Sequence, residues 1–357
     1  MPLKCVLDNQ PCFSFTYTPR AWEALKTSRN NHDMRMPCCK SKAIPKTSVL
    51  GTQFFAHARR GECSSGQETR EHLLAKYLIA RGAHEAGWSV DVERRGETPG
   101  GQTWVADVFA TKGKAKVALE VQWSSQSENE TRRRQQRYRE SGVRGAWFLR
   151  KTRQYNPAFL SIMSDQATPS FMIQMDEGGQ NFHVGHSRML LPAFVTDLLT
   201  GKIRWTPKPG EVGFVGPIVL DESCWKCRQP TGVVASMAIK DSQGVGLEYL
   251  DYDDSRIREH LTRITADEEL RHQHRIGPLS YRYSRTEGRS YFSNGCFHCG
   301  ALQGRFFIRD ALLEVLVTHY PEPIGWYPFI FSSELAKELG RWSHIERDSE
   351  DSVEDNS

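Results

Sequence analysis

The sequence predicts a mixed fold, of the α+β or α/β class, whose core follows the order helix, three strands, helix, strand. Between residues 65 and 155, helix-like and strand-like segments follow one another in that order, with glycines at the breaks. Cysteine clusters on either side predict a zinc-knuckle-like unit over residues 1–64 and a four-cysteine, zinc-ribbon-like unit over residues 221–345. Residues 156–220 are expected to connect these parts and pack on the core, and residues 346–357 to form a disordered acidic tail.

Composition indicates a globular protein. The chain has 357 residues, enough for two or three domains, with 38% apolar and 25% charged residues. No apolar run approaches the ~18 residues of a transmembrane helix, and the N-terminus has no signal-peptide pattern. We therefore expect a soluble protein of the cytoplasm.

Charge and cysteine are unevenly distributed. The net charge of +4 is mild, but residues 131–153 hold nine basic residues and one acid, and residues 346–357 hold six acids and one base. The nine cysteines are an odd number and fall in clusters. In a cytosolic chain this pattern favours metal sites over disulfides.

The central stretch of the predicted core is a β-hairpin. Thr103–Ala110 and Lys116–Gln122 both alternate and are rich in Val, Trp and Phe, with a glycine-containing break between them. If the loop consists of Gly113 and Lys114, Asp107 lies opposite Glu120, with Cβ atoms about 4.5–5.5 Å apart. Two carboxylates so close repel unless a cation lies between them or one binds a proton. A hard cation such as Mg²⁺ is the usual solution, because it prefers oxygen ligands.

A helix is predicted before the hairpin, from an N-cap at Thr69 to a stop at Gly87. Leu73, Leu74, Tyr77 and Leu78 give it an apolar face. Glu71 lies in its first turn, and His72 and Lys76, four residues apart, are neighbours on one side. Taken alone, such a set is most often a solvated face.

The strand Trp88–Glu93 follows and places Asp91 and Glu93 on the face opposite its apolar residues. Glu93 is either a further metal ligand or a partner of Arg94 or Arg95, and we favour the second.

A strongly basic helix is predicted from Asn129 to Ser141, followed by the buried strand Ala146–Leu149. Its arginines, and one shortly after it, lack matching acids apart from Glu140: Arg132, Arg133, Arg134, Arg137, Arg139 and Arg144. Such helices are often only solvated faces. Unpaired cations beside a phosphate-binding site neutralise phosphates, however, and we favour DNA-backbone contacts by Arg132, Arg133, Arg134 and Arg137.

The N-terminal unit is expected to contain a helix over Thr18–Lys26 and a strand over Thr52–His57. Its candidate zinc ligands are Cys38, Cys39, His57 and Cys63, which together would complete a tetrahedral site. The alternative is a degenerate knuckle with buried free thiols and no metal, and the sequence leaves both open.

The C-terminal unit carries two Cys-x-x-Cys knuckles, Cys224–Cys227 and Cys296–Cys299. Four thiolates at this spacing predict a structural Zn²⁺, whereas a redox pair would need one thioredoxin-like motif. The long gap between the knuckles predicts an inserted unit. Helices are further expected at Leu191–Thr200 and Asp310–His319, and a strand at Lys202–Trp205.

The hairpin resembles the signature of the PD-(D/E)XK nuclease superfamily, in which an Asp near a strand end precedes a hairpin turn and Glu-x-Lys. The chain is similar to the competence protein CoiA-like branch in the pieces Ala106–Val108 and Ala118–Gln122, with Gln122 where most relatives have Lys. Glu71–Lys76 resembles the helix that opens that core, and Phe54–His57 resembles a run that follows an N-terminal knuckle in this branch.

The resemblance implies a Mg²⁺-dependent (or Mn²⁺-dependent) nuclease that hydrolyses DNA. Asp107 and Glu120, with the Val121 carbonyl, would hold the metal. Lys76 would supply the cation missing at Gln122, with His72 and Glu71 as further candidates for water positioning or metal binding. The setting implied is DNA uptake and recombination, or defence against foreign DNA, with recombination or defence proteins as partners.

Two other classes of function stay open. The glutamine at position 122 is the argument for a non-catalytic DNA-binding accessory protein on the same fold, and a purely structural zinc protein is the third option. The strandedness of the substrate, the choice between DNA and RNA, and the oligomeric state are not predicted.

Overall fold

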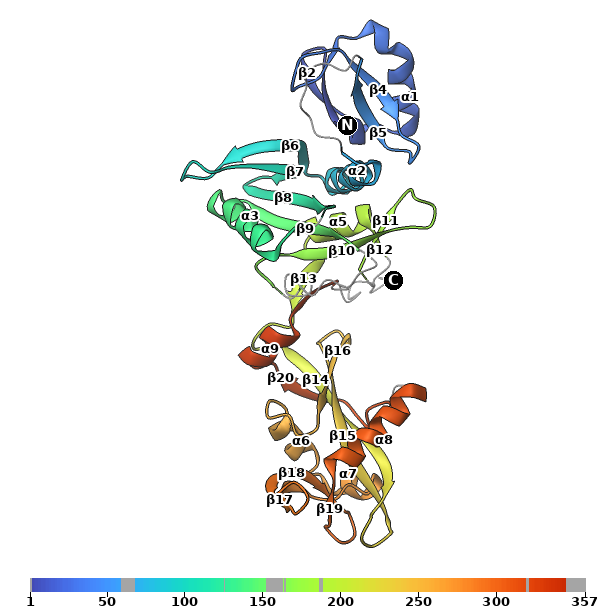
Figure 1. The fold of residues 1–357 in the computed structure, drawn as a ribbon, viewed down its shortest axis with the longest axis vertical. Helices are drawn as coiled ribbons and strands as arrows, with labels where there is room; N and C mark the ends of the chain where they lie inside the picture. Colours follow the sequence, from blue (N-terminus) through green and yellow to red (C-terminus); the bar gives the residue numbers. More distant parts are fainter. Residues whose placement is uncertain are drawn as a thin grey trace, which may run out of the picture. The chain divides into compact units, whose positions relative to one another are not determined.

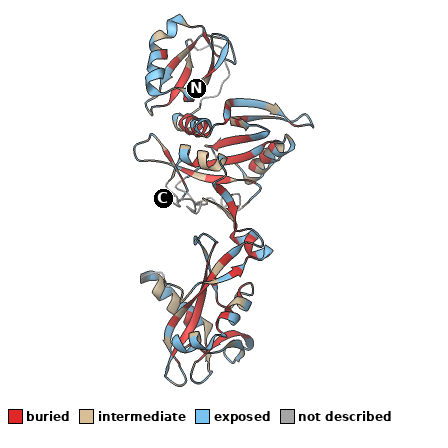
Figure 2. Cartoon of the chain, turned by 180° about the vertical axis from the view of Figure 1, so that it is seen from behind, coloured by how far each residue is buried: buried red, intermediate tan, exposed pale blue. Residues whose placement is uncertain are grey.

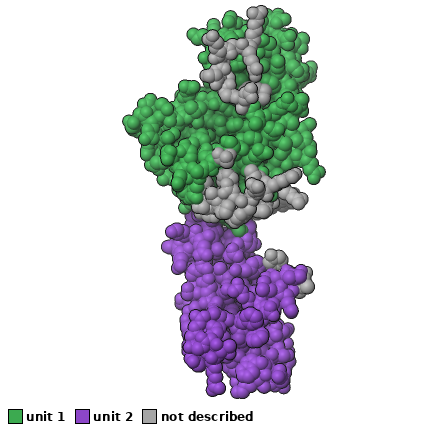
Figure 3. Space-filling view, in the orientation of Figure 1, with its two compact units in different colours: residues 1–204, 341–347 green, residues 205–340, 348–357 purple. Residues whose placement is uncertain are grey.

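The computed structural model describes residues 2–58, 68–124, 126–151, 163, 165–185, 189–318 and 321–344. The chain forms two units (Figure 3): unit 1 is Met1–Arg204 with Arg341–Arg347, and unit 2 is Trp205–Gly340 with Asp348–Ser357. The predicted connecting segment, 156–220, is divided between them. Cys63 and the predicted acidic tail lie outside the described residues. Each unit has a hydrophobic core of its own.

Unit 1 is built on a seven-stranded sheet with the order β12-β11-β10-β9-β8-β7-β6 (Figure 1). β9 is parallel to β8 and β10, and the other neighbours are antiparallel. The strands are β6 Ser89–Glu97, β7 Thr103–Lys112, β8 Ala115–Gln122, β9 Arg144–Arg150, β10 Ser170–Met175, β11 Phe182–Val184 and β12 Met189–Leu190. Helices α2 (Arg70–Glu85) and α5 (Leu191–Leu199) pack on one face, and α3 (Glu128–Glu140) packs on the other.

The order α2, β6, β7, β8, α3, β9 is the predicted order of helix, three strands, helix, strand. The central strands β8 and β9 are buried on both faces, as Figure 2 shows, because helices cover both sides of the sheet. Their pairing starts at Val117 opposite Arg144 and brings the end of β8 into the interior.

Helix α2 begins and ends where its sequence predicts. The Thr69 hydroxyl accepts a hydrogen bond from the His72 amide, and Gly87 adopts a φ of +75° directly after the helix. Near its C-terminal end α2 touches α5 at Gly82, where a Cβ atom would lie 2.4 Å from the Pro192 carbonyl oxygen. Glycine is therefore required where α2 crosses α5.

The hairpin turns at Gly113 and Lys114, as predicted. Its ladder runs from Lys112 opposite Ala115 to Val108 opposite Leu119. Gly113 has a φ of +58°, a left-handed conformation that glycine adopts without steric cost.

The N-terminal part of unit 1 has its own small core around Cys5, Cys12, Trp22 and Phe55. The predicted helix is α1, in which the Thr18 side chain accepts from the Ala21 amide. The elements are β1 Lys4–Leu7, β2 Gln10–Phe13, η1 Ser14–Thr16, α1 Pro19–Ser28, η2 Arg29–Asn31, β3 Met34–Arg35, β4 Ala43–Thr47 and β5 Gln53–His57. β1 to β3 form one sheet and β4 with β5 a second.

The described residues of unit 2 form two sheets and four helices, and the stretch between the two knuckles contributes strands to both sheets and two of the helices. One sheet has the order β16-β15-β14-β20 and the other β17-β18-β19. The elements are β14 Val212–Ser223, β15 Pro230–Lys240, β16 Gly246–Asp251, α6 Arg258–Ile264, α7 Glu268–Gln273, β17 Leu279–Ser284, β18 Arg289–Gly295, β19 Leu302–Gln303, α8 Arg305–Thr318, β20 Tyr327–Ile330 and α9 Ser333–Leu339. The helix predicted at Asp310–His319 is α8, which begins earlier, at Arg305.

The chain passes from unit 1 to unit 2 within β13 (Ile203–Thr206) and returns at β21 (Arg341–His344). Within the described ranges, every helix is too short or too polar to cross a lipid bilayer.

Candidate functional site

The β7–β8 ladder stops just before the two predicted carboxylates. Its register would continue from Val108 and Leu119 to Asp107 and Glu120, but the pairing ends there. Instead, the Val121 amide donates to Asp107 Oδ2 at 2.9 Å. The two strands therefore separate at the carboxylates, so that the expected direct cross-strand pair is replaced by a backbone-to-side-chain hydrogen bond.

The neighbouring strand is also irregular at this level. Glu93 of β6 lies between the pairs Val92–Val108 and Arg94–Ala106, which places it level with Asp107. Its φ is +53°, a region that non-glycine residues seldom adopt. Such residues persist where the surrounding contacts hold them, often at functional sites.

Lys76 of α2 lies at the centre of a cluster of carboxylates. Its Nζ is 3.0 Å from Glu68 Oε1 and 3.6 Å from Asp107 Oδ1, and it also donates to Glu93. The side chain is only 4% exposed. The prediction that Glu93 pairs with Arg94 or Arg95 is wrong. Glu93 binds Lys76, and Arg94 lies near Asp91 instead.

The cluster shifts the pKa values of Lys76 and Asp107 so that each group favours its charged form. Burial alone would lower the pKa of Lys76, but Asp107, Glu68 and Glu93 outweigh it and raise that pKa above its usual value. Burial would likewise raise the pKa of Asp107, but His72, Lys76 and the Val121 amide lower it to about 2. Three carboxylates face one lysine, so the cluster carries excess negative charge.

His72 lies beside the same cluster, one turn before Lys76. Its Nδ1 is 3.4 Å from Glu68 Oε1, and its Nε2 is 3.8 Å from Asp107 Oδ2, longer than a hydrogen bond. Nε2 is buried and has no hydrogen-bond partner in the described part of the chain. The ring stacks on Trp123, which also contacts the Arg150 guanidinium. A water molecule or ion between His72 and Asp107 would satisfy this nitrogen.

Glu120 is completely buried and both of its oxygens are bound by α3. Arg134 donates to Oε2 at 2.6 Å, and the Tyr138 hydroxyl donates to Oε1. Burial and the nearby charge of Asp107 raise the pKa of Glu120 to about 8, and they outweigh Arg134 and Tyr138, which act in the opposite direction.

The other two candidates lie apart from these contacts. Gln122 is buried, and its amide nitrogen donates to the Ser124 carbonyl oxygen at 2.5 Å. Glu71 is next to His72 on α2, so it points about 100° away around the helix axis. The structure thus brings His72, Lys76 and Asp107 together and places Glu71 outside their contacts.

The expectation that the arginines of α3 lack acidic partners is wrong for three of them. Arg132 pairs with Glu128 at 2.8 Å and with Asp165, and Arg133 pairs with Glu130 at 2.9 Å. Glu128 and Glu130 belong to the first turn of the helix, which begins at Glu128 rather than Asn129. Asp165 follows the helix in the chain. Arg134 turns inward to Glu120 and stacks on Trp147.

Sequence reasoning missed Glu68 and the inward role of Arg134 and Tyr138. Glu68 precedes the N-cap Thr69 and lies outside the helix, so helix spacing does not place it beside His72. In α3, Thr131, Arg134 and Tyr138 are spaced as one helix face, and that spacing was a usable signal.

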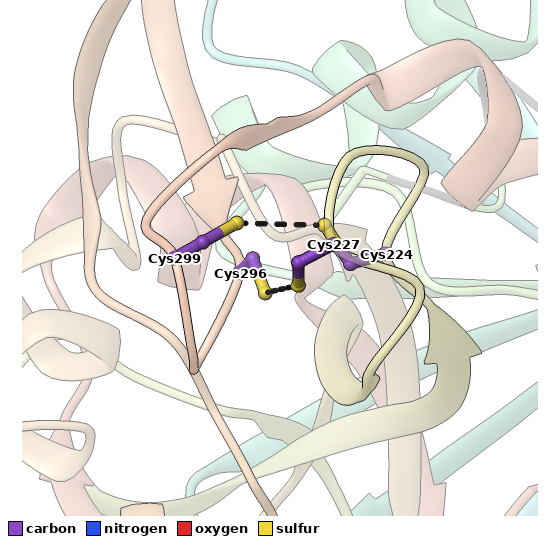
Figure 4. Close-up of side chains that lie close together, drawn as sticks. All are labelled: Cys224, Cys227, Cys296 and Cys299. Atoms are coloured by element: carbon purple, nitrogen blue, oxygen red, sulfur yellow. Dashed lines mark hydrogen bonds between the residues drawn. The ribbon is translucent and has the colours of Figure 1, made fainter.

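The four cysteines of unit 2 form a second candidate site (Figure 4). Cys224 and Cys299 lie 3.7 Å apart at their sulfurs, as do Cys227 and Cys296, and all four sulfurs lie within 4.8 Å of one another. Burial acts to raise the pKa of Cys224, but the amides of Cys227 and Lys226 and neighbouring thiols lower it to about 6. Four converging thiols, once deprotonated, could hold a metal such as zinc.

The two knuckles share one backbone pattern. In each, the first cysteine amide donates to the carbonyl five residues on, at 3.0 Å for Cys224 and 2.8 Å for Cys296. The amide four residues on donates back to the first cysteine, at 2.9 Å in both. The residue that donates it, Arg228 or Gly300, has a positive φ of 62° or 67°.

The N-terminal unit contains the same pattern with a methionine in the first position. The Met36 amide donates to Ser41 at 2.8 Å, Lys40 donates to Met36 at 2.8 Å, and Lys40 has a φ of +57°. Cys39 therefore occupies the position of the second knuckle cysteine. Its sulfur is 3.3 Å from His57 Nε2, and with Cys38 these ligand atoms lie within 4.8 Å of one another. This cluster could also hold a metal, with Cys38 in place of the first cysteine.

Among the described residues, these two cysteine clusters are the groups that bring at least three His, Cys, Asp or Glu ligand atoms within 4.8 Å of one another. The carboxylate cluster around Lys76 does not reach that density, because its oxygens surround a lysine.

Residues 68–184 match the family model described as the nuclease-like domain of competence protein CoiA. This segment is a CoiA nuclease-like domain. It begins at Glu68, the carboxylate next to Lys76, and ends with β11, so it contains α2, the hairpin and α3. No curated protein matches the chain at a significant level. The match indicates a nuclease-like role for this segment, which contains the Asp107 cluster.

Proposed function

We propose that the CoiA nuclease-like domain hydrolyses DNA phosphodiester bonds with a divalent metal at the end of the β7–β8 hairpin. The observation that carries this proposal is the charge imbalance at Asp107. Three carboxylates, those of Asp107, Glu68 and Glu93, surround the single ammonium group of Lys76. The element order α2-β6-β7-β8-α3-β9 supports a PD-(D/E)XK core.

The donor set suits Mg²⁺ or Mn²⁺. Asp107 and Glu120, with the Val121 carbonyl, would hold the ion, since hard cations prefer carboxylate and carbonyl oxygens. A bound ion would polarise the phosphate and lower the pKa of a water molecule. Because Glu120 has a pKa of about 8, it must lose a proton and exchange Arg134 or Tyr138 for the metal.

Two residues of α2 complete the proposed site. Lys76, 3.6 Å from Asp107, supplies the positive charge that Gln122 lacks, and it would stabilise charge that develops on the phosphate. His72 Nε2, which faces Asp107 without a hydrogen bond, is placed to orient a water molecule and to accept its proton. Glu71 has no assigned part in this arrangement.

DNA would lie along α3. Arg133 is 65% exposed, and its one acidic partner among the described residues is Glu130, one turn away. Exposed pairs of this kind contribute little, so a phosphate can replace the glutamate. Arg132 and Arg137 lie on the same helix. Recombination or defence proteins remain the proposed partners in the cell.

A second candidate function is a non-catalytic DNA-binding accessory protein. Both oxygens of Glu120 are already bound by Arg134 and Tyr138, and Gln122 carries no charge. An ancestral metal site in which a protein cation replaced the metal would have these contacts.

A cleavage assay separates the two. Zinc-loaded protein is incubated with single-stranded, duplex and branched DNA in Mg²⁺, Mn²⁺ or neither. Asp107→Asn and Glu120→Gln should each lower the rate by roughly 10²–10³, the loss typical of one electrostatic stabiliser. Glu85→Gln, an exposed α2 residue paired with Arg81, is the matched control and should cut at the wild-type rate. Wild-type protein that binds DNA and cuts none of these substrates would establish the accessory function instead.

A further inference from the structure

Unit 2 carries an open cleft of about 820 Å³ that contains a group of exposed aromatic side chains. Trp225, Tyr283, Phe306 and Phe307 line it and are 61%, 63%, 73% and 73% exposed. Large apolar side chains this exposed are costly in water, and four of them around one cleft indicate a binding surface.

The aromatic rings come from three separate elements. Trp225 lies between the cysteines of the first knuckle, Tyr283 is on β17, and the two phenylalanines begin α8. The Trp225 indole nitrogen donates to the Leu302 carbonyl at 2.8 Å, which fixes the ring while its face stays exposed. A ring held in this way loses little conformational entropy when a flat ligand stacks on it.

Cations accompany the aromatic rings. Glu287 in the cleft is neutralised by Arg289 at 3.1 Å and by Arg305 at 3.2 Å. Lys226 and Arg285 are exposed, and no acidic partner is found for either among the described residues. Glu222 also lines the cleft, so its lining holds two acids, Glu222 and Glu287, and two bases, Arg285 and Arg305. Lys226, next to Trp225, and Arg289, which contacts Glu287, lie beside it, so that basic residues outnumber acidic ones around the aromatic faces.

We propose that this cleft binds single-stranded DNA, with unpaired bases stacked on Trp225, Tyr283 and Phe307 and phosphates paired with Lys226 and Arg285. Aromatic faces with flanking cations suit a strand whose bases are exposed and whose backbone is anionic. A duplex hides its base faces and cannot stack. The aliphatic residues of the lining, Val233, Leu302 and Ile308, are buried or half-buried, so the apolar surface that the cleft exposes is aromatic rather than the aliphatic surface that would suit an aliphatic protein partner. This inference extends the proposed DNA function, because it gives the chain a second DNA contact and names its strandedness.

The test measures binding of a labelled oligothymidine and a labelled duplex to full-length, zinc-loaded Asp107→Asn protein without Mg²⁺, so that no cleavage interferes. Adding Trp225→Ala or Phe307→Ala should weaken oligothymidine binding about 5- to 100-fold for each stacked base and leave duplex binding unchanged. Tyr249→Ala, an exposed aromatic of β16 outside the cleft, is the matched control. Zinc content and thermal unfolding confirm that each variant is folded.

Three results would overturn the inference: oligothymidine binding unaffected by Trp225→Ala and Phe307→Ala, equal losses for oligothymidine and duplex, or a concentration-dependent dimer that Phe306→Ala abolishes. The last would show that a second copy of the chain covers the surface. The outcome is independent of the proposed nuclease. Cleavage that depends on Asp107 can stand while the cleft fails, and the cleft can bind single strands in a protein that cuts nothing.

Discussion

Two of the three candidate metal sites of this protein satisfy their ligands in opposite ways. In unit 2, Cys224, Cys227, Cys296 and Cys299 converge with no cation of the protein among them. In the CoiA nuclease-like domain, Asp107 and two other carboxylates surround Lys76, and Arg134 and Tyr138 bind Glu120. The cysteine ligands are arranged for a metal alone, whereas the carboxylates are arranged for internal cations that a metal must displace.

The difference has a physical origin in the ligands. A neutral thiol loses little when it is buried, so four can converge before metal binds. An ionised carboxylate cannot be buried unpaired without a large loss of hydration, so it requires a cation at all times. We therefore expect the cysteine site to stabilise the fold and the carboxylate site to exchange its cations during function.

The largest expected effect concerns the cysteine site. Cys227→Ser should abolish zinc binding and unfold unit 2, because structural zinc contributes on the order of 10–16 kcal/mol of apparent binding free energy in small domains. Elemental analysis of zinc and limited proteolysis of unit 2 measure the two effects. Cys12→Ser, in the N-terminal core and outside both clusters, is the control. Freshly purified wild-type protein without zinc would contradict the comparison at this point.

Next in size is the loss of the internal cation. Lys76→Met leaves three carboxylates without their lysine and should destabilise unit 1 by about 3–5 kcal/mol in urea unfolding. Added Mg²⁺ should restore part of this loss by binding the folded state. Lys114→Met, in the exposed hairpin turn, should change stability by no more than about 0.5 kcal/mol. If Mg²⁺ stabilises Lys76→Met no more than the wild type, the cluster is not a cation site.

A pH titration tests the burial of Glu120. Its pKa in the folded protein, about 8, is raised above the ordinary value of 4.5. The stability from its protonated form is thus complete below about pH 4.5 and is lost as the pH rises to about 8. Without metal, Glu120→Gln should gain stability relative to the wild type between these pH values, and the difference should be constant above them. Thermal unfolding curves that stay parallel from pH 5 to 9 would show that Glu120 titrates normally.

A smaller effect is expected at the N-terminal knuckle. Met36→Cys would place a thiol at the position that Cys224 and Cys296 occupy in the other two knuckles, and it should strengthen metal binding by Cys39 and His57. Retention of zinc against a chelator measures this. Met34→Cys, also buried but outside the knuckle, is the control. Equal retention by both variants would mean that the shared backbone pattern does not form a metal site.

The smallest effect separates the outward and inward arginines of α3. Arg133→Ala should weaken duplex binding and reduce the slope of log K against log salt concentration by about 0.9, the value for one lost phosphate contact. Arg134→Ala should instead lower kcat, because Arg134 lowers the pKa of Glu120 and its loss would keep that carboxyl group protonated. Salt-dependent binding and steady-state kinetics on the same substrate compare them. A larger salt effect from Arg134 would reverse their roles.

Much of the CoiA nuclease-like domain is predictable because its signals are local. Thr69 and Gly87 bound α2, and Gly113 marks the hairpin turn, since caps and turns depend on a few adjacent residues. The spacing of His72 and Lys76 likewise follows from one helix turn.

The contacts that decide the site were not predictable, because they join distant parts of the chain. Glu93 reaches Lys76 only because β6 is irregular where it passes Asp107. Arg134 turns inward because Glu120 is buried beneath α3. The role of Met36 depends on backbone hydrogen bonds that no cysteine spacing reveals. The sequence pattern therefore predicted the elements that carry the candidate site, and the fold determined which side chains meet there.

The most direct test of the central claim, that the Asp107 carboxylates exchange protein cations for a divalent metal, is a Mn²⁺ titration followed by electron paramagnetic resonance. It compares zinc-loaded wild-type protein with Asp107→Asn at about pH 8, where Glu120 ionises. We expect the wild type to bind roughly one or two Mn²⁺ per chain, the number of ions used by such hydrolytic sites, and Asp107→Asn to bind none with unchanged zinc. Equal Mn²⁺ binding by the two proteins, or none by either, would contradict the claim.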